Sequence, residues 1–76
     1  MIVKFEDIGA TIRKLRIKKG LKQMDVALTS GYTNAHISRI ETEAVEPSIQ
    51  GAVNILNAMG YEVRILIEPI EEKNNG

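Results

Sequence analysis

Cysteine is absent from this sequence, which excludes disulfide bonds, thiolate zinc sites and cysteine nucleophiles. Histidine occurs once, at His36; because a metal site needs several donors, we expect it at a surface or phosphate-contacting position. No apolar run could span a bilayer, and acidic residues interrupt the start, MIVKFEDIG, where a signal peptide would be apolar. We therefore predict a cytoplasmic protein that uses no metal or other cofactor.

Little of the chain is available for a core, because its 76 residues make one small domain. Since neither a disulfide nor a metal can add stability, oligomerisation is the remaining common way to bury more surface. Patterns of catalytic residues are also missing: no paired carboxylates, nucleophile–base pair or phosphate-binding glycine loop stands out. An enzyme is therefore not predicted.

The net charge is zero, but the charges are unevenly distributed along the chain. Residues 1–30 hold seven basic and three acidic residues, whereas residues 31–76 hold three basic and seven acidic ones. Such a separation allows a basic face to meet phosphates while an acidic face points away. An ordinary solvated helix surface is the alternative interpretation of the basic half.

Four segments show the spacing of helices. The first is predicted from about Glu6 to Lys19, before Gly20, and the second from Lys22 or Gln23 to Ser30, before Gly31. The third follows a cap at Thr33, and the fourth follows a cap at Ser48 and ends at Gly60. The residues expected to face inward on the last three helices are Val26, Ala27, Leu28, Ile37, Ile40, Ile49, Ala52, Val53, Leu56 and Met59.

After Gly60 the apolar period changes from helical to alternating. The apolar residues at every second position are Tyr61, Val63, Ile65 and Ile67. This alternation predicts a strand that ends at Pro69. A lone strand needs a partner for its backbone groups, and we expect the same strand of a second subunit across a two-fold axis. The short segment at residues 2–5 is the only other candidate in the chain. We thus predict an all-α fold of four to five helices over residues 1–68 with a C-terminal dimerisation strand, and a disordered tail over 69–76.

Two short helices joined by a glycine-containing turn form a helix-turn-helix unit, whose second helix enters the major groove of DNA. Ala27 supplies the small side chain where the two helices cross, and Gly31 suits the turn. Ile37 and Ile40 anchor the second helix from its inner side. The four residues therefore fit the unit at offsets of four, six and three positions.

The stretch LKQMDVALTSGYTNAHISRIETEAVEPSIQGAVNILNAMG resembles the helix-turn-helix domains of phage repressors, Cro proteins and their XRE-like bacterial relatives. The resemblance covers roughly residues 8–60. The segment NILNAMGYEVRILIE is similar to the ending of HipB-type antitoxins, whose terminal strands pair between subunits. Antitoxins of the HigA type share the helical part.

This resemblance implies roles by position. Gln23 lies where the family's glutamine binds a backbone phosphate, and Arg16 with Glu41 resembles a pair that orients the arginine towards phosphate. Helix capping is the alternative role of Thr33. The resemblance, together with the basic first half of the chain, implies that the DNA-binding residues are Arg16, Lys22, Gln23, Thr33, Asn34, Ala35, Ser38 and Arg39.

The expected function is a sequence-specific transcriptional repressor that binds a palindromic operator as a homodimer. The resemblance further implies a HipB-like antitoxin that represses its own operon and binds a kinase-type toxin like HipA. A phage- or plasmid-type repressor without a toxin partner, or a protein-interaction module of the same fold, stays open. Two departures from the family are an acidic loop, ETEAVEP, and a tail without an aromatic anchor for a toxin.

Overall fold

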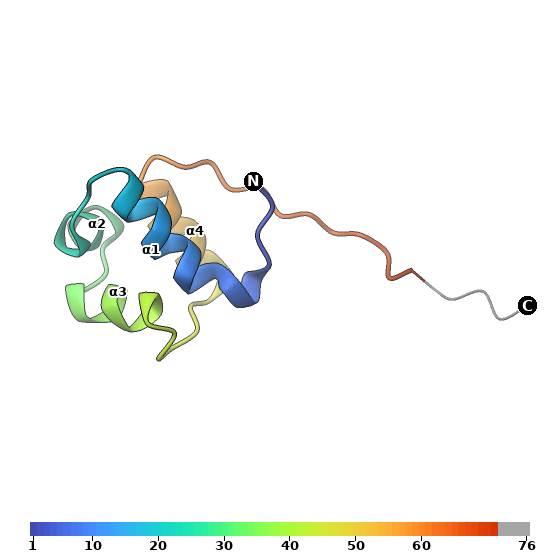
Figure 1. Ribbon diagram of the computed structural model, residues 1–76, viewed down its shortest axis with the longest axis horizontal. Helices are drawn as coiled ribbons and strands as arrows, with labels where there is room; N and C mark the ends of the chain where they lie inside the picture. The colour runs from blue at the N-terminus through green and yellow to red at the C-terminus, as the bar shows by residue number, and fades with distance from the viewer. Residues whose placement is uncertain (72–76) are drawn as a thin grey trace, which may run out of the picture.

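The computed structural model describes residues 1–71. A short 3-10 turn, η1 (Phe5–Asp7), leads into α1 (Ile8–Lys18), α2 (Gln23–Ser30), α3 (Asn34–Glu41) and α4 (Ile49–Ala58). Both α1 and α2 contact α3 and α4. Figure 1 shows α1 beside α4, with α2 and α3 at one end of the bundle and the C-terminal segment leaving on the other side. The predicted all-α architecture is confirmed, and the described residues contain no helix long and apolar enough to cross a membrane.

The helix ends are set by the residues that the sequence indicated. The Thr33 hydroxyl accepts a hydrogen bond from the backbone N–H of His36 at 3.1 Å, and the Ser48 hydroxyl accepts one from Gly51 at 2.9 Å. Each bond satisfies a backbone donor that the first turn of a helix leaves free. Gly31 ends α2 with a φ of 81°, a conformation that costs glycine nothing.

The core lies where the four helices meet. Four isoleucines are fully buried there, and Val26, Ala27, Ala52, Leu56 and Met59 complete the buried set around Ile12, Ile37, Ile40 and Ile55. Burying one such aliphatic side chain contributes about 1.5–3 kcal/mol to folding. The core therefore holds α3 in place from its inner side through two of its eight residues.

Two predictions about the core are wrong. Leu28 is 77% exposed, because it lies about 200° around α2 from the buried Val26. Ile49 is 57% exposed in the first turn of α4, whereas Ile55, which the pattern did not single out, is fully buried. Both surplus apolar side chains are therefore on the surface of the single chain.

Lys19 joins the ends of two helices that are distant in sequence. Its ammonium donates a hydrogen bond to the carbonyl of Met59 at 2.8 Å and lies 4.4 Å from the centre of the Tyr61 ring. The backbone N–H of Tyr61 also donates to the carbonyl of Leu56 at 3.0 Å. These contacts fix the point at which the C-terminal segment leaves the helices.

The predicted strand is not formed in this single chain. Residues 1–71 contain no strand, and the N-terminal segment at 2–5 does not pair with residues 61–68. Tyr61 and Val63 pack against the core, but the chain beyond them is exposed. A strand needs a neighbour for its backbone bonds, and the described chain offers none. Residues 69–71 of the predicted tail are exposed, and 72–76 lie outside the described residues.

Candidate nucleic-acid interface

The outer side of α3 collects the side chains that the sequence singled out. Thr33, Asn34, Ala35 and Arg39 are exposed and Ser38 is half-buried. On a helix, positions 34, 35, 38 and 39 share one face because they are separated by one, three, four and five residues. The buried Ile37 and Ile40 occupy the opposite face. The arrangement presents one polar helix face, with donors, acceptors and a methyl group, on the outside of the bundle (Figure 1).

The unit that carries this face is a pair of short helices with a tight turn. The backbone N–H of Gly31 donates to the carbonyl of Ala27 at 3.0 Å, which closes α2, and Thr33 then begins α3. Ala27 is buried between the helices, as its small side chain predicted. The predicted offsets of Ala27, Gly31, Ile37 and Ile40 are therefore those of a real helix-turn-helix unit.

An ion pair ties the far end of α3 to α1. The Nε and Nη2 of Arg16 donate to the two carboxylate oxygens of Glu41 at 2.7 and 2.8 Å. The remaining nitrogen, Nη1, donates to the carbonyl of Leu21 at 2.8 Å. The Glu41 side chain is only 1% exposed, so its charge depends on these donors. The pair fixes α3 relative to α1 and to the turn before α2.

Gln23 belongs to the same network. Its side-chain Nε2 donates to Glu41 at 3.2 Å, so the residue at the start of α2 is linked to the end of α3. The hydrogen bond that Arg16 donates to Glu41, together with the charge of Glu41, raises the pKa of the guanidinium against the opposing effect of burial. All three nitrogens of Arg16 are bonded within the protein, and a contact between Arg16 and DNA stays a prediction.

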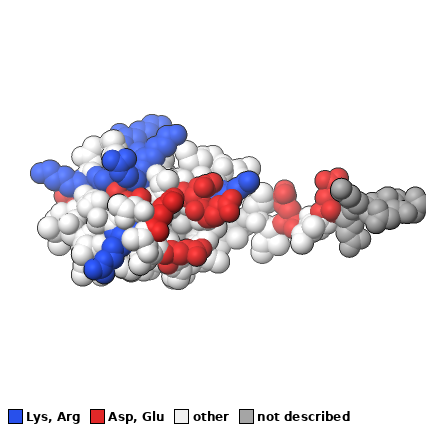
Figure 2. All heavy atoms as spheres, turned by 60° about the horizontal axis from the view of Figure 1, so that its bottom comes forward, with Lys and Arg blue, Asp and Glu red and all other residues white. Residues whose placement is uncertain are grey.

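Basic and acidic side chains lie on separate parts of the surface. On the face shown in Figure 2, Lys and Arg gather along one edge and one end of the bundle, and Asp and Glu gather nearer the exit of the C-terminal segment. Lys22, just before α2, is exposed. Its backbone N–H donates to the Asp25 carboxylate at 2.8 Å, which leaves its ammonium available to a partner.

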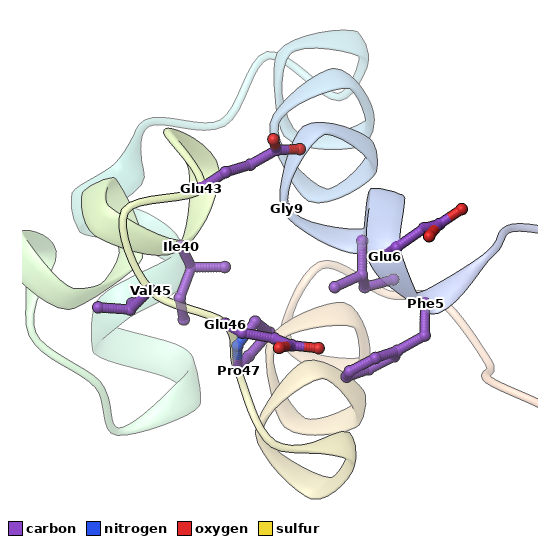
Figure 3. Close-up of a pocket in the computed structure, with 9 residues that line it drawn as sticks. Phe5, Glu6, Gly9, Ile40, Glu43, Val45, Glu46 and Pro47 are labelled. Carbon is purple, nitrogen blue, oxygen red and sulfur yellow. The ribbon is translucent and has the colours of Figure 1, made fainter.

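Three glutamates surround a small pocket next to the C-terminal end of α3. Figure 3 shows Glu6 from η1 and Glu43 and Glu46 from the following loop around a cavity of about 280 Å³. Glu43 has a φ of 64° and is the only non-glycine residue with positive φ among residues 1–71. Like charges repel phosphate, so this end of α3 is unsuited to a nucleic-acid backbone. The polar face at the N-terminal end of α3 is free of this cluster.

The close approach of α1 to α3 was not predicted. A Cβ atom on Gly9 would collide with the backbone carbonyl oxygen of Ile40. Gly9 therefore allows α3 to lie directly against the first turn of α1. A buried glycine inside a helical pattern was the available signal, since it marks a close backbone approach.

His36 is partly covered by an aromatic neighbour. The Tyr32 and His36 rings stack with centroids 5.1 Å apart and an angle of 16° between their planes. Across residues 1–71, no group of three or more potential metal-binding side chains gathers around it or elsewhere. The stack orients His36 at the start of α3, beside the exposed Ala35.

Comparison with known proteins gives two related chains. A stretch of 63 residues is 32% identical to the uncharacterized HTH-type transcriptional regulator y4dL of Sinorhizobium fredii and covers 83% of this chain and 32% of that protein. A stretch of 65 residues is 28% identical to the uncharacterized HTH-type transcriptional regulator y4dJ of the same organism and covers 86% of this chain and 84% of the other. The chain thus spans about a third of the first relative and most of the second. No solved structure matches significantly.

Residues 12–66 match the family described as helix-turn-helix, which agrees with the geometry of α2, the turn and α3. The match begins in α1 and runs past α4, so it covers most of the chain. The protein belongs to the helix-turn-helix family.

Proposed function

We propose that this protein is a sequence-specific DNA-binding regulator of transcription that acts as a repressor. The observation that carries the proposal is the exposed polar face of α3, held from behind by buried isoleucines and by the Arg16–Glu41 pair. A helix presented in this way fits the major groove, where base pairs differ in their donors and acceptors. The family match and the two relatives named as transcriptional regulators support the same function.

The proposed base contacts come from the N-terminal part of α3. Asn34 bonds an adenine through both atoms of its amide, and Ala35 with the Thr33 methyl group contacts thymine methyl groups. Thr33 also caps the helix through its hydroxyl, so its methyl group is the part that remains for DNA. Arg39, with Ser38 beside it, reads a guanine or binds a phosphate one turn further along.

The proposed phosphate contacts lie on the neighbouring helices. Gln23 and Lys22 at the start of α2 bind the DNA backbone, where a helix N-terminus also favours negative charge. Arg16 acts mainly by positioning α3, and two of its N–H groups remain for a phosphate. Because these contacts displace counterions, the affinity falls steeply as salt rises.

The regulator acts as a homodimer on a palindromic operator. Two copies joined through the segment that contains Tyr61, Val63, Ile65 and Ile67 place their α3 helices in successive major grooves, ~34 Å apart. The exposure of Ile65 and Ile67 in the single chain supports this pairing, because it leaves apolar surface that a second copy covers.

Binding to the DNA upstream of its own gene tests the proposal. Fluorescence anisotropy with this DNA and with a scrambled duplex of equal length, at low and moderate salt, should give tighter binding to the upstream DNA and weaker binding to both as salt rises. Equal affinity for the two duplexes would contradict sequence-specific recognition. Absence of binding to either would favour a protein-interaction module.

The finer proposal is an antitoxin that represses its own operon. The observation that favours it is the apolar segment that follows α4, whose sequence is similar to the ending of HipB-type antitoxins. A HipA-like kinase toxin encoded by the adjacent gene should then co-purify with this protein and strengthen operator binding. A neighbouring gene without such a product would favour a phage- or plasmid-type repressor.

A further inference from the structure

The apolar side of the C-terminal segment continues beyond the domain that it belongs to. Tyr61 and Val63 pack against the core. In extended chain, every second side chain points to the same side, so Ile65 and Ile67 share their direction. Yet these two side chains are 64% and 89% exposed, because the segment has already left the helices, as Figure 1 shows. The same apolar face therefore serves two bodies, of which the single chain provides one.

A groove beside the segment is also apolar. It measures about 730 Å³ and lies between the N-terminal residues, α1, α4 and residues 61–66. The exposed side chains of Ile2 and Ile49 are among those that line it. A second apolar segment laid beside the first would face this groove.

From these features we infer the register in which two copies pair. Resting on the proposed dimer, the inference is that residues 63–69 form an antiparallel ribbon with Leu66 opposite Leu66 of the second copy. Arg64 then lies opposite Glu68, and Ile65 lies opposite Ile67, on both sides of the two-fold axis. The second copy is thus the occupant of the apolar face and of part of the groove.

Space restricts the position of the axis. The two-fold axis of such a ribbon is perpendicular to it, so both helical domains lie on the same face, each attached near residue 62. An axis at Val63 or Arg64 would separate the attachment points by only ~7 or ~13 Å, at ~3.3 Å per residue. The two shorter dimensions of the molecule are 24 and 20 Å, so the domains would overlap. An axis at Leu66 separates them by ~27 Å, which is enough.

Charge selects Leu66 over its neighbours. An axis at Ile65 would place Glu62 opposite Glu68 twice, whereas an axis at Leu66 places Arg64 opposite Glu68 twice. An axis at Ile67 would place Glu71 opposite Val63, on the apolar face. Only the register centred on Leu66 therefore separates the domains, pairs opposite charges and keeps the apolar face free of charge.

Single-cysteine cross-linking measures this register directly, because the chain contains no cysteine of its own. Each of residues 63–67 is replaced by cysteine in turn in the full-length chain, which is then oxidised gently. Disulfide formation should be fastest for Leu66→Cys, since that residue meets its own copy. For Ile65→Cys the two Cα atoms would be ~8 Å apart, beyond the ~7 Å that a disulfide spans.

The outcomes separate the register from the dimer. A maximum at any other position would overturn the register, while sedimentation of the unmodified protein as a dimer would leave the proposed function standing. No cross-link at any position, with the unmodified protein sedimenting as a monomer at micromolar concentration, would contradict both.

Charge reversal provides a second measurement that leaves the apolar residues intact. Arg64→Glu should raise the dimer dissociation constant roughly three- to thirtyfold, and adding Glu68→Arg should restore it. The matched control adds Glu62→Arg instead, because Arg64 and Glu62 of one chain lie 3.5 Å apart. Equal rescue by this control would assign the effect to the contact within one chain and would overturn the register.

Discussion

Among single residues, Arg16 has the contacts on which the position of α3 depends most. Replacing Arg16 with Met removes the cation from a carboxylate that is almost fully buried, and we expect the free energy of unfolding to fall by about 3–5 kcal/mol. Urea denaturation measures this loss. Arg13→Met, which removes an exposed arginine from the same helix, is the control, and an equal loss in both variants would contradict the structural role of Arg16.

The titration of Arg16 has a defined consequence for pH. Its pKa is raised in the folded state, so the stabilisation is fully present below the unfolded pKa of arginine and is lost only as pH rises through the folded value. That window is strongly alkaline. The contribution of the Arg16–Glu41 pair through Arg16 is therefore constant across neutral pH.

Asn34 is the residue whose role in reading bases is easiest to isolate. It is exposed, and the cap of α3 is made by Thr33, so Asn34→Ala should leave folding intact. We expect discrimination at one base pair of the operator to fall by about 1–3 kcal/mol. Affinities for operators substituted at each position measure it, with Asn57→Ala on α4 as the control. Equal weakening on specific and random DNA would contradict a base contact.

Between elements, the packing of α1 against α3 depends on one glycine. Gly9→Ala should destabilise the protein by about 1–3 kcal/mol, because the added methyl group meets the backbone carbonyl of Ile40 and the helices must separate. Gly51→Ala is the matched control: it also lies in a helix, but its methyl group would meet the movable side chains of Tyr32 and Ser48. If thermal denaturation gave the two variants equal stabilities, this account of the α1–α3 contact would be wrong.

The four helices were predictable because their end signals are local. Thr33 and Ser48 act as caps within their own turns, and Gly31 ends α2 with its own backbone conformation. The helix-turn-helix unit followed from the same signals and from the spacing of Ile37 and Ile40. For the candidate site, these signals predicted which residues share the outer face of α3.

Contacts between distant segments were not predictable in the same way. Lys19 meets the carbonyl of Met59, and Gly9 meets Ile40, and no local pattern encodes such pairs. The inward face of α2 was misjudged at Leu28, because eight residues give barely two turns from which to define a face. The alternation after Gly60 predicted a strand, but backbone pairing needs a partner that the single chain lacks.

At the scale of the whole molecule, the C-terminal segment should control assembly without controlling folding. A chain ending at Val63 keeps all four helices and loses mainly exposed residues, so its melting temperature should change little. Without pairing, the affinity for a full operator should fall by about 100-fold or more, because the two reading helices are no longer linked. Sedimentation and anisotropy measure these effects.

A chain ending at Glu71 is the control for this truncation, since it keeps the whole proposed ribbon. It should remain dimeric and bind the operator with full affinity. If the shorter chain also stayed dimeric with full affinity, the second copy would have to attach through another surface.

Selection from a pool of random duplexes tests the central claim most directly, because the protein itself picks out the operator by binding it. The account predicts enrichment of a two-fold symmetric sequence whose half-sites are centred about 10–11 base pairs apart, one turn of the double helix. Recovery of no common sequence, or of a single half-site without its symmetric mate, would contradict it.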